Sequence, residues 1–321
     1  MFTLKKNKLS TANQPEADRR IQTDEALKNE MKAWNKKKIN WVPFILVLPL
    51  FLIVFIFLVI PLINSFAVSF SNYTGPMQYD MSQLTLSNYI KFFQSKTNLT
   101  VLWRTIRLSI ITTLLCIVIG YPAAYYMTKL KGGAQQLYLL VYLAPWMINV
   151  VVKALGWQIL ISNNGIINSA LMSLGITSEP IKMMFTEFAV TLGVTHGSIV
   201  FAILPMFTSL SAIDPNIGYA AANLGATPAQ VFRKVTLPLS RNGIVSGALI
   251  VFAMTMATYT TPVLLGGSKN HVMSYLVQEQ STKLMNWPYG GAVSFILVAA
   301  SLILTAIIQK VFEDRRRMDV M

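Results

Sequence analysis

The sequence predicts an all-α membrane protein with six transmembrane helices. Of its 321 residues, 54% are hydrophobic and only 12% are charged, a balance that favours a polytopic membrane protein over a soluble domain. Six apolar runs each approach the roughly 20 residues that a helix needs to cross the hydrocarbon core. Because backbone groups in lipid must pair within their own segment, apolar runs without a two-residue alternation predict helices rather than barrel strands.

Each apolar run is predicted to form one spanning helix, and the first is a retained anchor because it is too long for a signal core. The third contains Lys153, whose side chain is expected to reach toward the headgroups, although it could line a pathway. Gly243 and Gly247 in the fifth predict a close helix crossing within the bundle. The six runs are 41–63, 108–127, 137–161, 188–210, 244–265 and 290–308.

Basic residues determine the predicted orientation, since Lys and Arg in short flanks are retained on the cytoplasmic side. Most of the 27 Lys and Arg residues lie in the tails, in the loop after the second run and in the loop after the fourth. Because the net charge of +14 is divided among loops beside membrane spans, it predicts contact with lipid and no nucleic-acid partner. The predicted order is a cytoplasmic tail (1–40), a first transmembrane helix (41–63), a periplasmic segment (64–100), a five-helix core (101–312) and a cytoplasmic tail (313–321).

The polar segment 214–238, here called the docking loop, predicts two short helices joined at a corner. Asp214 and Pro215 can cap and begin the first helix, and Gly225 can end it. Thr227 begins the second helix, and Pro238 is predicted to stop it. Small residues on the first helix and apolar residues on the second suit insertion into a groove of a partner protein.

The docking loop resembles the cytoplasmic loop of permease subunits of bacterial ABC importers. Its Tyr-Ala-Ala is followed by three residues and a Gly, and then by nine residues and Val-Thr-Leu-Pro. This spacing matches that of the family's E-A-A, G and I-x-L-P motif. Tyr219 stands where the family usually has Glu, and Val235 where it has Ile. The resemblance implies an ABC permease fold of the type I importers, with a coupling helix that docks on the ATPase. The residues that it implies for this contact are Tyr219, Ala220, Ala221, Leu224, Gly225, Ala226, Phe232, Val235, Leu237 and Pro238.

Three further stretches resemble such permeases. Residues 88–93 are similar to the N-Y-x-x-F stretch before their core, and 151–168 and 261–267 are similar to parts of the spermidine and putrescine type. The resemblance implies binding-protein-dependent import of a polyamine across the bacterial inner membrane, with both termini cytoplasmic. The implied partners are a second permease subunit, an ABC ATPase dimer and a periplasmic or lipid-anchored solute-binding protein. Opines, phosphonates and ferric ion, which related permeases handle, stay open as substrates.

Polar and aromatic side chains in or beside the apolar runs are the candidates for a substrate pathway. Hydroxyls gather in the fifth run just before Pro262 and Gly266, where the helix is predicted to break, and they could either line the pathway or stabilise the kink. Aromatic faces and carboxylates are the groups that recognise ammonium. The candidates are Trp146, Asn149, Trp157, Glu187, Thr255, Thr258 and Tyr259.

Motifs for catalysis are missing from the sequence: it has no phosphate-binding loop, no H-E-x-x-H, no G-x-S-x-G and no C-x-x-C. His196 and His271 fall too far apart in the pattern to suggest a shared metal site, and His196 is expected to bond a neighbouring helix. Cys116 is the single cysteine. The sequence therefore predicts a transporter subunit without cofactor or metal, whose ATP is hydrolysed by a partner. A channel or secondary transporter is the alternative, but it would need paired charges in the membrane and no docking loop.

Overall fold

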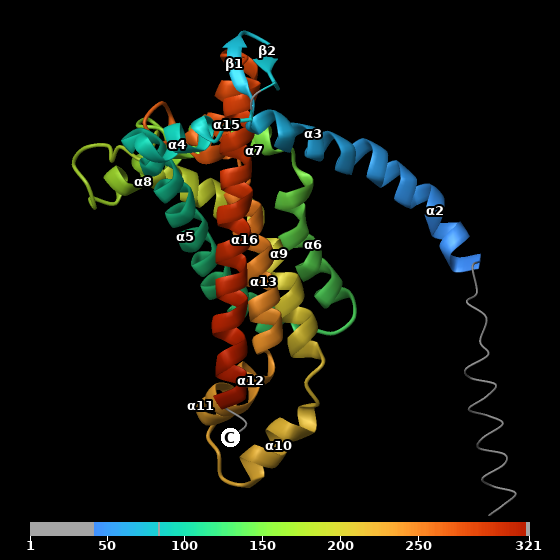
Figure 1. Cartoon of the computed structure of the whole chain (residues 1–321). Helices are drawn as coiled ribbons and strands as arrows, with labels where there is room; N and C mark the ends of the chain where they lie inside the picture. Colours follow the sequence, from blue (N-terminus) through green and yellow to red (C-terminus); the bar gives the residue numbers. More distant parts are fainter. Residues whose placement is uncertain (1–41, 83, 319–321) are drawn as a thin grey trace, which may run out of the picture. The chain divides into compact units, whose positions relative to one another are not determined.

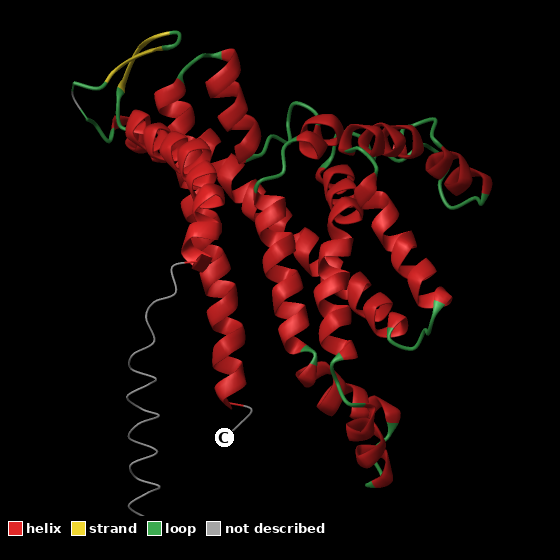
Figure 2. Cartoon of the chain, turned by 90° about the vertical axis from the view of Figure 1, so that its right-hand side faces the viewer, coloured by secondary structure: helices red, strands yellow, loops and turns green. Residues whose placement is uncertain are grey.

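The computed structural model describes residues 42–82 and 84–318, which are mostly helical, as the sequence predicts (Figures 1 and 2). The predicted tail at 1–40 and the last three residues of the predicted tail at 313–321 lie outside the described residues. The chain divides into residues 1–63 and 64–321, and each part is described by itself.

In the first part, the predicted first span is helical from Val42 onward. α2 (Val42–Val54) leads through the π-helical turn η1 (Phe55–Val59) into α3 (Ile60–Ser69), which ends in the second part. Nearly all described side chains from 44 to 63 are apolar and exposed. A helix that is apolar on every side is typical of one surrounded by lipid or by other membrane helices.

The second part contains one two-stranded hairpin and the remaining helices, so the hairpin is a small addition to the predicted all-α fold. Its strands are β1 (Asn72–Gly75) and β2 (Gln78–Asp80), which are antiparallel. Its longer helices are α5 (Lys96–Met127), α6 (Gly133–Met147), α7 (Val150–Ile161), α9 (Glu187–Ser211), α13 (Arg241–Met256) and α16 (Trp287–Met318). Its shorter elements are α4 (Ser87–Gln94), α8 (Ile166–Ser173), α10 (Pro215–Asn223), α11 (Pro228–Val231), η2 (Phe232–Thr236), α12 (Leu237–Leu239), α14 (Thr260–Gly266), α15 (Met273–Gln278) and η3 (Glu279–Lys283).

Glycines set the packing of α13 against α9 at the centre of the bundle. A Cβ atom on Gly243 would lie 2.5 Å from the Cβ of Ser209 and 2.6 Å from the carbonyl oxygen of Pro205, and one on Gly247 would lie 3.0 Å from the Ala202 oxygen. Only residues without a side chain allow two helix backbones to approach this closely. The predicted close crossing therefore lies within this chain.

Two of the predicted spans are broken in the structure. The run 137–161 is divided into α6 and α7, and the side chain of Asn149 accepts a hydrogen bond from the amide of Val151 at 2.8 Å to cap α7. The run 244–265 is divided at 257–259, earlier than the predicted break at Pro262 and Gly266. Pro262 lies in the first turn of α14, where its missing N–H leaves no helical hydrogen bond unmade.

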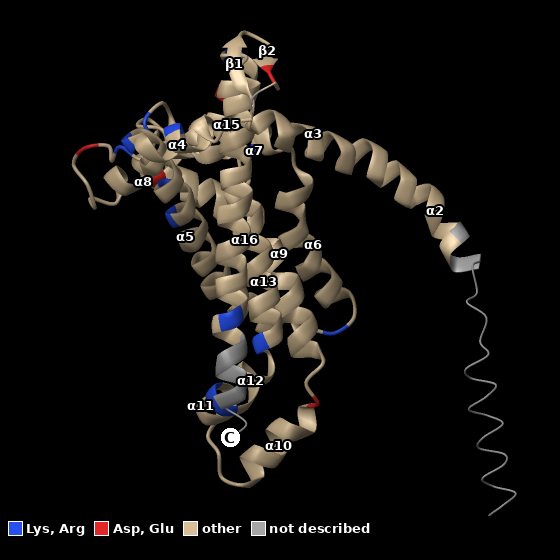
Figure 3. Ribbon diagram, viewed as in Figure 1, with Lys and Arg blue, Asp and Glu red and all other residues tan. Residues whose placement is uncertain are grey.

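Of the other predicted spans, some begin and end where the sequence predicts and others extend further. α9 matches the run 188–210 to within one residue at each end, whereas α5 begins at Lys96, twelve residues before the predicted 108. Among the described residues, five helical segments are long and apolar enough to cross a membrane, and a pair that meets at a 59° bend near Ser240 gives up to six. Lys and Arg gather at the two ends of the second part, and most of the ribbon between them is uncharged (Figure 3).

The N-Y-x-x-F stretch, which begins at Asn88 in α4, lies near the hairpin end of the bundle (Figure 1). The side-chain amide nitrogen of Asn88 donates to the backbone carbonyl oxygens of Ser69 and Ser71, at 3.0 Å each. The side chain of Phe92 is fully buried. The hydroxyl of Tyr89 lies 2.7 Å from that of Ser69. This stretch therefore holds the end of α3 against α4.

Candidate functional site

The docking loop has the predicted shape of helix, corner and helix, and it lies at the end of the bundle opposite the hairpin (Figure 1). Gly225 forms the corner with φ of +87°, a conformation that strains most residues with a Cβ. Its amide donates to the oxygen of Ala222 at 2.9 Å, and the Ala226 amide donates to the oxygen of Ala221 at 3.1 Å. These two bonds form a Schellman motif, which satisfies the last carbonyls of α10.

Both helices of the loop are capped by the residues that the sequence indicates. The carboxylate of Asp214 accepts from the amide of Asn216 at 2.9 Å. Thr227 and Gln230 form a reciprocal capping box, in which each side chain accepts from the other residue's amide. The loop thus builds its own backbone geometry from local signals.

The prediction that Pro238 stops the second helix is wrong. The helix continues through η2 and α12 to Leu239, and the chain bends only at Ser240. In η2 the amide of Leu237 donates to the oxygen of Phe232, five residues earlier. A π-helical turn of this kind changes the hydrogen-bond register just before the proline, so the helix can proceed through a residue that has no N–H.

The residues implied for partner contact divide into two groups. The side chains of Tyr219 and Leu224 are 68% and 90% exposed, so α10 offers apolar surface at the tip of the loop. Phe232 instead points into the bundle, with its ring perpendicular to those of Tyr121 and Tyr125 at 5.9 Å and 5.8 Å between centroids. A cavity of about 480 Å³ lies between the two helices and is lined in part by Tyr219, Phe232 and Val235.

Beneath the loop, a buried hydrogen bond connects α5 to the bend before α13. The hydroxyls of Tyr121 and Ser240 lie 2.8 Å apart, and both residues are buried. Together with Phe232, this pair places the docking loop in direct contact with two central helices.

A second cavity, of about 430 Å³, lies beside the break between α6 and α7. Four of the predicted pathway residues line it: Trp146, Asn149, Trp157 and Thr258. Lys153 also lines it. The indole nitrogen of Trp157 donates to Nδ1 of His196 at 3.2 Å, which agrees with the expectation that this histidine bonds a neighbouring helix.

Three predicted pathway residues are not among those that line this cavity. Thr255 is buried, and its hydroxyl donates to the carbonyl oxygen of Val251 at 2.8 Å. This hydroxyl therefore bonds to its own helix and does not face the cavity. Tyr259 lies in the break between α13 and α14. Glu187 lies at the start of α9, in a separate polar network.

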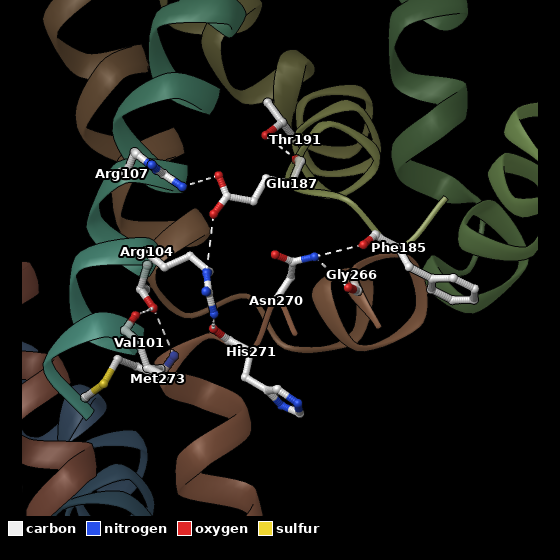
Figure 4. A network of polar contacts seen from close by, with 11 residues as sticks. Val101, Arg104, Arg107, Phe185, Glu187, Thr191, Gly266, Asn270, His271 and Met273 are labelled. Atoms are coloured by element: carbon white, nitrogen blue, oxygen red, sulfur yellow. Dashed lines mark hydrogen bonds and ion pairs between the residues drawn. The ribbon is translucent and has the colours of Figure 1, made fainter. Parts of the chain in front are cut away.

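The polar network around Glu187 connects α5, α9 and the loop between α14 and α15 (Figure 4). Its carboxylate pairs with Arg104, at 3.3 Å from Nε, and with Arg107, while Arg104 also donates to the oxygen of His271 at 3.2 Å. Asn270 extends the network by donating to the oxygens of Phe185 and Gly266. Two arginines thus pair with this carboxylate, and Glu187 lies apart from the four candidates that line the second cavity.

Comparisons with known proteins agree with this geometry. No family model matches the chain. The spermidine/putrescine transport system permease protein PotB of Haemophilus influenzae is 33% identical over 248 residues, which are 77% of this chain and 86% of the relative. The protein of the same name from Escherichia coli is 32% identical over 213 residues, covering 66% and 77% of the two chains.

Solved structures show the same fold at low sequence identity. A chain of a bacterial ABC transporter that imports alginate superposes with a TM-score of 0.70 at 16% identity, covering 88% of this chain and 99% of that one. A second structure, of an alginate transporter with its pentasaccharide-bound periplasmic protein, gives 0.71 at 17% identity, with 86% and 95% covered. Fold and docking loop thus define a multi-pass permease subunit of an ABC transporter in the inner membrane, and the predicted resemblance is confirmed.

At the level of sequence, the chain belongs to the family of the spermidine/putrescine transport system permease proteins. It is accordingly a transporter subunit and not an enzyme.

Proposed function

We propose that this chain is a permease subunit of an ATP-driven importer that moves a polyamine, spermidine or putrescine, into the cytoplasm. The observation that carries the proposal is 33% identity across 86% of a permease named for these two substrates. The partners are a second permease subunit, an ABC ATPase dimer at the docking loop and an outer solute-binding protein. An alginate transporter solved together with its periplasmic protein supports such an assembly.

The docking loop faces the cytoplasm in this proposal, and both chain termini lie on the same side. Arg233 and Lys234 lie in η2 and Arg241 begins α13, so these basic residues flank the loop, which is consistent with the retention of basic flanks in the cytoplasm. The division into tails at 1–40 and 313–321, a periplasmic segment at 64–100 and a core at 101–312 follows from this orientation. The hairpin and the Glu187 network then lie on the outer side.

Transport requires the loop to act as a lever. Closure of the ATPase dimer would displace α10 and α11, and Phe232 and Ser240 would pass the movement to α5 and α13 through Tyr121. Because packed interfaces have discrete arrangements, such a displacement can switch the side to which the central cavity opens. The cavity beside Trp146 and Trp157 is the part of the pathway that this subunit contributes.

The cavity offers aromatic faces to a cation, and its described lining contains no carboxylate. Trp146 and Trp157 can bind an ammonium group through cation–π contact. The carboxylates that a polyamine requires would therefore come from the second permease subunit. Lys153 favours the alternative of an anionic cargo such as an opine or a phosphonate, and a transport assay with competitors separates the two.

Substituting Gly225 tests the lever and the cargo together. Ala at this position meets no atom within 4 Å, so its effect comes only from the positive φ, which costs about 1–2 kcal/mol. We expect ATP-driven uptake of radiolabelled putrescine by the reconstituted complex to fall roughly five- to thirtyfold, since 1.4 kcal/mol is about tenfold. Asn, which tolerates this conformation, should retain most of the uptake.

Gly218 provides the matched control, because a Cβ there would be in ordinary contact with Val231 at 3.8 Å. Uptake by Gly218→Ala should equal that of the unsubstituted complex. Uptake of an opine or a phosphonate in place of putrescine would overturn the polyamine assignment, and full uptake by Gly225→Ala would overturn the lever.

A further inference from the structure

Lys153 is placed where neither helix stability nor the membrane favours a positive charge. It lies in the first turn of α7, and the N-terminal end of a helix carries a positive partial charge that disfavours cations. Its ammonium extends across the cavity toward α9, where a Cβ on Gly197 would lie 3.6 Å from Nζ. The side chain therefore lies against the cavity wall inside the bundle.

This charge has no ion-pair partner among the residues that the structure describes. The ion pairs there join Arg104 and Arg107 to Glu187, and the other residues that line the cavity with Lys153 are uncharged. An intramembrane ammonium is costly unless a carboxylate or another strong acceptor faces it. In the proposed complex the second permease subunit forms the facing side of the pathway, and a carboxylate there would compensate this charge.

The chemistry of the lysine side chain matches that of the proposed cargo. Four methylene groups and a terminal ammonium form an aminobutyl group, and putrescine consists of the same group ended by a second ammonium. Spermidine also contains it. A carboxylate site between aromatic faces that recognises one aminobutylammonium will accept another of equal charge and length.

We propose that Lys153 is a tethered competitor of the cargo, and that it occupies a carboxylate of the second permease subunit whenever the pathway is empty. An arriving polyamine displaces it, so the acidic site is never left unpaired in the membrane. This inference rests on the proposed function. It adds a specificity-determining residue, because a solute without an ammonium group could not release the tether.

Carbodiimide cross-linking of the complete detergent-solubilised complex tests the contact, since the reagent joins an ammonium to a carboxylate in direct contact. We expect mass spectrometry to find Lys153 linked to an acidic residue of the second permease subunit. Adding putrescine should remove the product, whereas an equal concentration of ethanolamine, a primary amine that reacts equally with an activated carboxylate, should not. Absence of a Lys153 product, or a yield that putrescine does not change, would overturn the proposal.

Binding measurements on Lys153→Met supply a second readout. With the tether removed, radiolabelled putrescine should bind the complex without its solute-binding protein at least about fivefold more tightly, because a site that the tether leaves free about a fifth of the time has its apparent affinity reduced by that factor. Lys182→Met, at an exposed position outside the cavity, is the control and should bind unchanged. Equal or weaker binding by Lys153→Met would contradict the competitor role.

Uptake by the unsubstituted complex separates this inference from the proposed function. If putrescine is taken up but no displaceable cross-link forms, the tether alone is wrong. If a cross-link forms but no polyamine is taken up, the cargo assignment is wrong, and the tether falls with it.

Discussion

Replacing Leu224 by Asp is expected to abolish binding of the ATPase subunits while the permease itself remains folded. The side chain is 90% exposed at the corner of the docking loop, so nothing within the chain depends on its packing. Full burial of a leucine in a partner's groove contributes about 2 kcal/mol, and a carboxylate there would also have to be desolvated. We expect the amount of ATPase that co-purifies to fall at least about 30-fold.

A matched substitution at the other end of the bundle controls for a general effect of charge. Leu174 is 72% exposed beside α8, and Leu174→Asp should co-purify with a normal amount of ATPase. Normal ATPase binding by Leu224→Asp would show that the tip of α10 is not the contact. The contact would then have to be sought on η2 or elsewhere.

Replacing Gly243 by Ala should have the largest effect on the stability of the bundle itself. The added methyl would lie within 2.9 Å of Ser209, Pro205 and Met206, and two of these contacts are with backbone atoms that cannot move aside alone. Overpacking of this kind costs about 1–3 kcal/mol. We expect a lower midpoint of thermal unfolding in detergent and reduced yield of the assembled complex.

Gly156→Ala is the corresponding control within a membrane helix. A Cβ at Gly156 meets no atom within 4 Å, and Ala favours a helix by up to about 1 kcal/mol relative to Gly. This variant should unfold at the same temperature or higher. If Gly243→Ala behaved like Gly156→Ala, the close crossing of α9 and α13 would be contradicted.

The docking loop could be predicted from sequence because its structure is determined by local signals. Asp214, Gly225 and Thr227 act on amides or dihedral angles within a few residues of themselves, so their spacing alone specifies helix, corner and helix. The helix end predicted at Pro238 is wrong because a π-helical turn precedes the proline and lets the helix continue. Nothing in the residue pattern around a proline distinguishes such a turn from a helix end.

The pathway candidates were predicted less well because their roles depend on contacts distant in sequence. Glu187 is balanced by Arg104 and Arg107, more than 75 residues earlier. The position of these two arginines on one face of α5, three residues apart, was the available signal. Lys153 faces the cavity because the third span breaks just before it, and Pro145 together with the capping residue Asn149 was the available signal for that break.

The central claim is that the docking loop is a cytoplasmic contact for an ATPase, and labelling of a single cysteine at its tip tests this most directly. Cys116 is the chain's one cysteine and is buried, so Cys116→Ser with Leu224→Cys leaves a single exposed thiol. A membrane-impermeant maleimide should label it in inside-out vesicles but not in right-side-out cells, and assembly with the ATPase should protect it. Labelling from the outside, or equal labelling with and without the ATPase, would contradict the account.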